Sequence, residues 1–496
     1  MTKKIYTMEE LDSISLYNLR LMLRELGGTP GTKNISELKE EIISIQSGKV
    51  VPSHNKRGRK PKVAPTTTEE STQNTEVERE GDPIVYEQKV RPYIPFYQRT
   101  GEDVSYSAGQ TYAPVSVTLC DTDVEPTNQI VVGNGILEVL QDGSGILHNY
   151  KYGVRSVDYF LDEKLVSFYS LMTGDKIVGY ANKRLYDGRY FLYEVTEIND
   201  YQREFFVRNP HFDRKTPVYP TENLIQNDEN SKTVRAIDLV APLAKGQRCL
   251  VIAPDNSGKT TLLKEIAKSL VSEESKLHLT AILVDAKPEE VNDFSQDLIR
   301  CELLNTTFDM QPHLQLRNIE MAFEHAKRLV ECGKEVVVLI DSLTKLVKLY
   351  KAVISSSSEN LVGVSPEYLA KRLFSNARNC EAGASLTIIA TLSYNENDAF
   401  DNLVYSEFKD LATNKIYLSG ELAENGVFPA LEVAKCVTDK IELFNDEEKV
   451  KAIRSFRRGL SSNEKCTEIL LEMLKQSKNN DEFIRKLPSW LKAILE

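Results

Sequence analysis

The spacing of apolar and polar residues changes along the chain and divides it into segments. From residue 234 onward, short apolar runs alternate with stretches of helical spacing. One apolar run, at 250–253, leads through a loop into the helical stretch 262–267. Alternating strands and helices predict an α/β domain with a largely parallel sheet, which we place at 216–496 together with C-terminal helices.

A different pattern precedes this domain, at residues 129–215. Apolar residues predict a strand at 133–140, and a turn follows at 141–145. Further short strands are predicted around 157–161 and 189–197, with a turn of sequence Thr-Gly-Asp between them. Several short strands separated by regular turns are typical of a small β-barrel.

The first 128 residues are poorer in apolar residues. Residues 1–47 are predicted to form a small helical module, because leucines recur at helical spacing at 16, 19, 23 and 26. Residues 48–128 are predicted to be a mostly disordered linker. Its basic run at 56–62 is similar to an AT-hook, and it is either a DNA contact or solvated linker. Tyrosine and proline residues at 83–115 either stack on bases or dock on a neighbour.

Composition narrows the function classes. The net charge of −11 argues against a protein coated in DNA, although it allows a local basic groove. Seven cysteines without a Cys-x-x-Cys pair, together with six histidines, make a zinc site or a disulfide framework unexpected. We expect free buried thiols in a reducing cytoplasm. No run of eighteen apolar residues occurs, so we expect a soluble cytoplasmic protein without membrane contact.

The strongest signal for chemistry is the loop Ala-Pro-Asp-Asn-Ser-Gly-Lys-Thr-Thr at 253–261, between the predicted strand and helix. In such a loop the backbone N–H groups and the helix N-terminus bind phosphate. Lys259 is expected to reach the β- and γ-phosphates and Thr260 to hold Mg²⁺, although Ala253 replaces the usual first glycine. The predicted nucleotide-binding residues are Asn256, Ser257, Gly258, Lys259, Thr260 and Thr261.

Two further apolar strands end in polar residues. The strand at 335–341 ends in Asp341, which is predicted to assist Mg²⁺ or, alternatively, merely to cap the strand. The strand at 384–391 ends in Thr391 and either points at the nucleotide or is purely structural.

Further segments, in this order and spacing, complete a recognisable series. They are Gly-Gln-Arg at 246–248, Lys-Pro-Glu-Glu-Val at 287–291, Asp-Ser-Leu-Thr-Lys-Leu at 341–346, Val-Tyr-Ser-Glu-Phe-Lys at 404–409 and Val-Phe-Pro-Ala at 427–430. Together they resemble the Rho family of bacterial transcription terminators over about residues 133–475.

The resemblance implies an OB-like, cold-shock-type RNA-binding barrel followed by a RecA-type motor that assembles as a homo-hexameric ring. Such rings translocate along nascent RNA and dislodge RNA polymerase. ATP is expected to sit between subunits with Phe428 near the adenine. Lys409 keeps the basic residue of one RNA-gripping channel loop at 408–415, whereas the other loop, at 353–365, looks shortened and lacks the family's lysine. The 1–47 module resembles the SAP-like module of many members, although an anonymous helical hairpin fits as well.

The barrel keeps part of the family's RNA site. Aromatic side chains stack on bases with little sequence preference. Ser144 and Ile146 replace two such aromatics and His148 replaces an arginine, which predicts weakened or altered RNA binding. The alternative for the two remaining aromatics is barrel core. The predicted RNA-binding residues of the barrel are Asp158, Phe160, Arg189 and Tyr190.

The positions that the resemblance assigns to hydrolysis are altered. Ala286 stands where the family has an acidic residue that polarises the attacking water. Gly426 and Asp439 stand where arginines would reach the transferred phosphoryl group, unless Lys435 or Lys440 compensates. Lys345 replaces another arginine and loses its bidentate fork.

These losses predict a Rho-like, RNA-binding terminator that binds ATP and Mg²⁺ but hydrolyses ATP slowly or not at all. The alternative is a non-hydrolysing paralogue that acts as a nucleic-acid-binding or regulatory ring subunit. A subunit related to rotary ATP synthases is a third interpretation, against which the barrel and the 287–291 segment argue.

Overall fold

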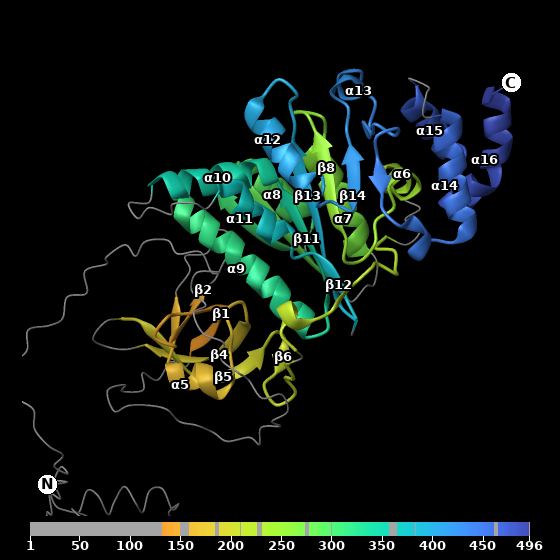
Figure 1. Cartoon of the computed structure of the whole chain (residues 1–496). Helices are drawn as coiled ribbons and strands as arrows, with labels where there is room; N and C mark the ends of the chain where they lie inside the picture. Colours follow the sequence, from red (N-terminus) through yellow and green to blue (C-terminus); the bar gives the residue numbers. More distant parts are fainter. Residues whose placement is uncertain are drawn as a thin grey trace, which may run out of the picture. The chain divides into compact units, whose positions relative to one another are not determined.

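The computed structural model of the chain describes residues 131–495, apart from 149–157, 184–187, 209, 226–230, 273–276, 299, 357–364, 382 and 461–464. The helical module predicted at 1–47 lies outside the described residues, as does the whole linker predicted at 48–128 with its basic run at 56–62. The described residues form a small β-barrel and an α/β domain, as the sequence predicts (Figure 1).

The barrel is a six-stranded sheet in the order β3-β2-β1-β4-β5-β6, and it closes because β3 also pairs with β5. Its centre is filled by alternate apolar side chains such as Leu137, Leu147 and Val195, which are fully buried. The helix α5 (Glu163–Phe168) begins at Asp162, whose side chain accepts from the backbone N–H of Lys164. The strands are β1 (Val131–Val139), β2 (Gly145–His148), β3 (Tyr159–Leu161), β4 (Lys176–Lys183), β5 (Tyr190–Ile198) and β6 (Tyr201–Gln202).

The α/β domain is built on a nine-stranded sheet with the path β10-β9-β11-β13-β8-β14-β15. All neighbours from β10 to β14 are parallel, whereas β15 is antiparallel to β14. The short strands β12 and β7 add an antiparallel edge beside β13. The strands are β7 (Pro217–Val218), β8 (Arg248–Ala253), β9 (Leu277–Ala286), β10 (Glu302–Thr307), β11 (Glu335–Asp341), β12 (Arg378–Cys380), β13 (Ser385–Ser393), β14 (Asn414–Tyr417) and β15 (Val437–Thr438).

Helices cover both faces of this sheet, which explains why its central strands are continuous apolar runs (Figure 1). One face packs against α6 (Lys232–Val240), α7 (Lys259–Ser272), α8 (Pro288–Asp297), α14 (Glu447–Leu460), α15 (Cys466–Lys475) and α16 (Asn480–Leu495). The other face packs against α9 (Pro312–Glu331), α10 (Leu343–Ser356), α11 (Pro366–Phe374) and α12 (Ala399–Phe408). Shorter elements are α13 (Gly420–Glu424), η1 (Phe212–Arg214) and η2 (Ile441–Leu443).

The helix α9 also carries contacts to the barrel. Nε of its Arg317 lies 2.8 Å from a carboxylate oxygen of Glu138 in β1. Near the end of the helix, Arg328 and Glu331 are almost fully buried and form an ion pair of 2.9 Å. Arg208, in the segment after the barrel, pairs with Glu331 at 3.2 Å. Because unpaired buried charges are costly, this network favours one arrangement of the segment against the helix.

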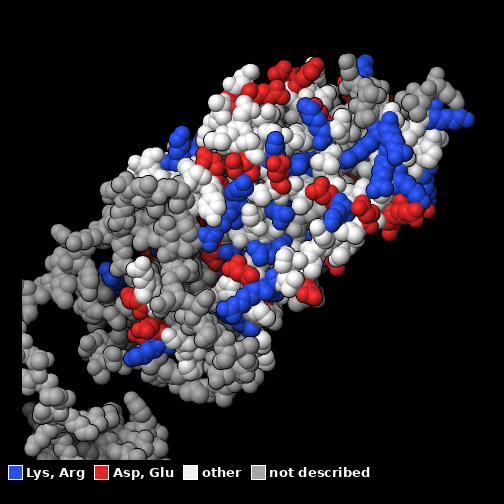
Figure 2. Space-filling view, in the orientation of Figure 1, with Lys and Arg blue, Asp and Glu red and all other residues white. Residues whose placement is uncertain are grey.

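Cysteines and charges follow simple patterns in the described part of the chain. Its six cysteines carry free thiols, four of them buried. Figure 2 shows Lys and Arg interspersed with Asp and Glu on the visible face, with basic side chains gathered over the C-terminal helices. Among the residues that the structure describes, no helix is long and apolar enough to cross a membrane.

Candidate nucleotide and RNA sites

The phosphate loop lies at the carboxyl end of β8, where the chain turns into α7. Asn256 and Gly258 adopt positive φ angles of 61° and 88°. The conformation at Gly258 favours glycine, because residues with a side chain rarely adopt it. The Ser257 hydroxyl donates to the Pro254 carbonyl at 2.7 Å and braces the turn. Ala253, at the place of the usual first glycine, is the last and buried residue of β8 and has an extended backbone.

Lys259 is held inside this loop. Its Nζ donates to the carbonyl oxygens of Ala253 and Pro254 at 3.2 and 2.8 Å and lies 3.2 Å from a carboxylate oxygen of Asp255. Burial opposes ionisation of Asp255, but the nearby ammonium outweighs it and lowers the pKa of this carboxyl. A phosphate group would therefore compete with Asp255 for the charge of Lys259.

Three polar side chains from three elements meet beside the loop. The Thr260 hydroxyl, at the start of α7, lies 2.5 Å from one carboxylate oxygen of Asp341 at the end of β11. The Thr391 hydroxyl, in β13, donates to the other carboxylate oxygen at 2.6 Å. Thr391 thus orients the carboxylate. An all-oxygen pair of hydroxyl and carboxylate fits Mg²⁺, and Thr260 and Asp341 are the residues that would hold it.

Phe428 lies over the same loop. Its side chain is 58% exposed, although it is large and apolar. A Cβ placed on Gly258 would lie 3.6 Å from its ring, so the ring stands directly against the glycine. The exposed aromatic face beside a phosphate loop suits a planar base, as predicted for the adenine. Thr261, also predicted to bind nucleotide, lies exposed in the first turn of α7.

The end of β9 carries Ala286, at the position that the resemblance assigns to an acidic residue. Ala286 is only 3% exposed and packs into the core between the sheet and α8. Asp285, the preceding residue, is exposed and has a φ of 47°. Its carbonyl accepts from Nζ of Lys345, which lies 3.2 Å away in α10. Glu290 is turned toward the N-terminus of α8, where its side chain accepts from the backbone N–H of Lys287 at 3.4 Å.

The predicted arginine positions offer no guanidinium. Gly426 is exposed with a φ of 73° and no neighbour within 4 Å of a Cβ placed on it. Asp439 is also exposed and follows β15. The two nearby lysines are engaged elsewhere in the chain. Lys435 pairs with Glu432 at 2.7 Å, and Nζ of Lys440 lies 3.2 Å from the centre of the Tyr219 ring.

The predicted RNA residues of the barrel divide between two faces. Tyr190 is half-buried and packs against the barrel core beside Tyr159. Phe160 lies on the other face, where it stacks on Phe191 with ring centres 5.4 Å apart. The Arg189 guanidinium lies 5.3 Å from the centre of the Phe160 ring. Phe160, Phe191 and Arg189 therefore form one outer platform that does not include Tyr190.

His148 and Asp158 are brought together, but within a network of charges. Nδ1 of His148 lies 3.4 Å from Asp158, and its Nε2 lies 2.9 Å from Glu138. Although burial opposes it, the hydrogen bonds to Asp158 and Glu138 raise the pKa of His148. Burial likewise opposes ionisation of Glu138, yet His148 and Arg317 lower its pKa to about 2. The histidine thus belongs to a hydrogen-bonded network of charged side chains in the barrel wall.

The two predicted channel loops are described unequally. Lys409 follows α12 and is half-buried, with Nζ 5.6 Å from the centre of the Tyr405 ring. The loop predicted at 353–365 is described only as far as the end of α10 and from the start of α11, and residues 357–364 lie outside the described part.

Sequence reasoning missed several residues at these sites. Phe191 is a neighbour of Tyr190 in β5, and strand alternation alone left open which of the two faces outward. Asp285 is adjacent to Ala286, and it is exposed and has a positive φ angle. The clearest omission is a cluster of His278, Glu302 and His325, which come from β9, β10 and α9 and share no sequence spacing.

Comparison with known proteins agrees with both domains. The family model of the Rho termination factor RNA-binding domain matches residues 133–204, which form most of the barrel. The model of the ATP synthase alpha/beta family nucleotide-binding domain matches residues 233–438.

Relatives of known name match a longer stretch of this chain than either family model does. The chain is 38% identical to transcription termination factor Rho of Cereibacter sphaeroides, over 71% of this chain and 86% of that protein. It is 37% identical to the Rho of Pseudomonas aeruginosa, over 71% and 87%. It is 32% identical to the Rho of Bacillus subtilis, over 79% and 93%. With these identities over most of both chains, the protein belongs to the family of transcription termination factor Rho.

Proposed function

We propose that this protein is an RNA-binding transcription terminator that binds ATP with Mg²⁺ but hydrolyses ATP slowly or not at all. One contrast carries the proposal. The side chains for nucleotide binding, Lys259, Thr260 and Asp341, are assembled around one loop. The positions for hydrolysis hold a buried methyl group at Ala286 and no guanidinium at Gly426 or Asp439.

Nascent RNA and RNA polymerase are the proposed partners, and a homo-hexameric ring is the proposed assembly. The relatives' name supports the role in termination, and the RNA-binding domain model supports RNA as the ligand. The Phe160 platform gives the barrel a stacking surface for bases. We place the nucleotide between subunits, because Phe428 and Thr260 lie at an exposed loop that a neighbouring subunit could cover.

The same contrast favours a second candidate. A subunit that binds ATP and RNA without turnover could act as a regulatory member of a ring. The two candidates differ in one property: a slow terminator still couples RNA binding to hydrolysis, whereas a regulatory subunit does not.

The test is steady-state release of phosphate by the purified full-length protein, with and without polypyrimidine RNA, beside the Lys259→Ala variant. Slow turnover that RNA stimulates and Lys259→Ala abolishes would support the terminator. Absent turnover with Lys259-dependent nucleotide binding would support the regulatory subunit. Turnover of many cycles per second would overturn impaired hydrolysis in either form.

A gain-of-function experiment asks which loss matters. Ala286→Glu supplies a general base, a group usually worth about 10²–10⁴ in rate. Asp439→Arg supplies a guanidinium, worth about 10³–10⁵ in related enzymes. We expect the double variant to exceed either single variant. Unchanged turnover in all three, with folding preserved, would show that neither position limits hydrolysis.

A further inference from the structure

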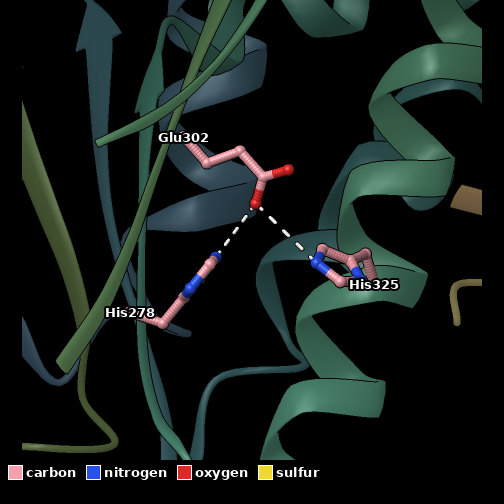
Figure 3. A group of neighbouring side chains, drawn as sticks. All are labelled: His278, Glu302 and His325. Atoms are coloured by element: carbon pink, nitrogen blue, oxygen red, sulfur yellow. Dashed lines mark hydrogen bonds and ion pairs between the residues drawn. The ribbon is translucent and has the colours of Figure 1, made fainter. Parts of the chain in front are cut away.

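His278, Glu302 and His325 bring three metal-ligating atoms to one point, far from the phosphate loop in the fold. His278 and Glu302 lie near the amino ends of β9 and β10, whereas the phosphate loop and Asp341 lie at carboxyl ends of the same sheet. His325 reaches the cluster from α9 (Figure 3). All three ligand atoms lie within 4.8 Å of one another.

The distances suit a small tetrahedral ion. Nε2 of His278 lies 2.9 Å from Oε2 of Glu302, and Nε2 of His325 lies 3.7 Å from the same oxygen. Two ligands of a tetrahedral zinc ion, each at about 2.0–2.1 Å, are about 3.4 Å apart. The two separations lie on either side of this value, so small side-chain rotations would bring the atoms to zinc distance.

The protonation pattern leaves a place for a cation. Nδ1 of His325 lies 2.7 Å from the carbonyl oxygen of Gly174, which can only accept, so Nδ1 carries the proton. Nε2 then presents a lone pair toward the Glu302 carboxylate. In this neutral tautomer, the nitrogen and the Glu302 oxygen face each other across 3.7 Å, both as acceptors.

The supporting contacts match those of metal sites. Metal-binding histidines usually donate their second N–H to a carbonyl or carboxylate, as His325 does to Gly174. The side chains of His278 and Glu302 are 25% and 38% exposed, which leaves an entry path. The ammonium group of the nearby Lys176 would repel a metal cation, but its Nζ lies 2.7 Å from Asp200, whose carboxylate offsets that charge.

We propose that His278, Glu302 and His325 form a binding site for a zinc-class divalent transition-metal ion, with water as the fourth ligand. The ion joins β9, β10 and α9, and through His325 it fixes the Gly174 turn of the barrel against the α/β domain. Two imidazoles and one carboxylate are a typical ligand set for zinc.

The test uses the full-length protein after dialysis against a chelator. Zinc binding is measured by competition with a chromophoric chelator, and cobalt is used as a spectroscopic substitute. We expect about one equivalent of tight zinc and visible absorption bands of tetrahedral cobalt. His278→Gln and Glu302→Gln should each weaken zinc binding at least about tenfold. His313→Gln, a half-buried histidine on the same helix as His325, is the matched control.

A second measurement, thermal unfolding, distinguishes loss of the metal site from poor folding of a variant. Zinc should raise the thermal unfolding temperature of the parent protein and of His313→Gln, because a ligand that binds only the folded state stabilises it. His278→Gln should lose that rise while keeping the metal-free unfolding temperature. Zinc binding that is absent, or that survives unchanged in both His278→Gln and Glu302→Gln, would overturn the site.

Discussion

The hydroxyl of Thr260 lies 2.5 Å from a carboxylate oxygen of Asp341, although 81 positions separate the two residues in sequence. Parallel packing of β8 beside β13 and of β13 beside β11 brings them to one edge of the sheet. The contact shows that the phosphate loop and the carboxylate strand converge as a single oxygen-rich site.

Replacing Thr260 by valine should therefore remove the effect of Mg²⁺ on nucleotide binding. We expect ATP affinity with Mg²⁺ to fall at least about tenfold, while affinity in chelator stays near that of the parent protein, because only one oxygen ligand is lost. Titration with a fluorescent ATP analogue measures both conditions. Thr391→Val, which removes only a hydrogen bond to Asp341, should have a smaller effect. An equal fall in ATP affinity when chelator removes Mg²⁺ would indicate damage to the phosphate loop instead.

Removing the charge of Asp255 should strengthen nucleotide binding. Asp255 holds Nζ of Lys259 at 3.2 Å, but its side chain is 84% exposed. Exposed ion pairs contribute about 0.2–1 kcal/mol, which corresponds to at most about a fivefold change. We expect Asp255→Asn to bind ATP up to about fivefold more tightly in the same titration. Weaker binding would mean that Asp255 positions Lys259 for the phosphates.

Phe160 and Tyr190, the two barrel aromatics predicted to bind RNA, should respond differently to substitution by alanine. Phe160→Ala removes one of the two aromatic rings of the outer platform and should weaken binding of single-stranded polypyrimidine RNA by about 1–3 kcal/mol. Tyr190→Ala opens the barrel core and should instead lower the thermal unfolding temperature. Fluorescence anisotropy with a labelled oligonucleotide and a thermal melt separate the two effects. A large loss of RNA affinity with unchanged melting in Tyr190→Ala would place the RNA on the opposite face.

His148 should make the stability of the barrel depend on pH. Its pKa in the folded protein is raised, so its charge stabilises the fold below the usual histidine pKa of about 6.5. That contribution is lost as the pH rises through the higher folded pKa.

Denaturant unfolding should therefore show a fall in stability as the pH rises above about 6.5, and His148→Gln should reduce that fall. The comparison of the two proteins isolates His148 from the other histidines. Identical pH profiles for both would contradict the charged network with Glu138 and Asp158.

Sequence reasoning succeeded where the signal is local. The apolar run before the phosphate loop, the loop itself and the helix that follows lie in one stretch of chain, and the structure forms β8 and α7 there. The carboxylate at the end of β11 was equally predictable, because a buried strand that ends in Asp341 has few ways to place that side chain. The barrel followed from turn spacing.

What could not be predicted depends on register between strands. Whether Phe160 or Tyr190 faces outward follows from the parallel pairing of β3 with β5, which closes the barrel and is invisible in either strand alone. The cluster of His278, Glu302 and His325 has the same origin, since three elements meet only once the sheet and α9 are assembled.

The contacts along α9 have a mechanical consequence. Arg317 holds β1 and His325 holds the Gly174 turn, and the two residues are eight positions apart, which corresponds to about 12 Å of helix. Because α9 contacts the barrel at these two points, rotation of the barrel about either contact is resisted by the other. A force on the barrel would therefore be passed through α9 to the strands β9, β10, β11 and β13, on which this helix packs.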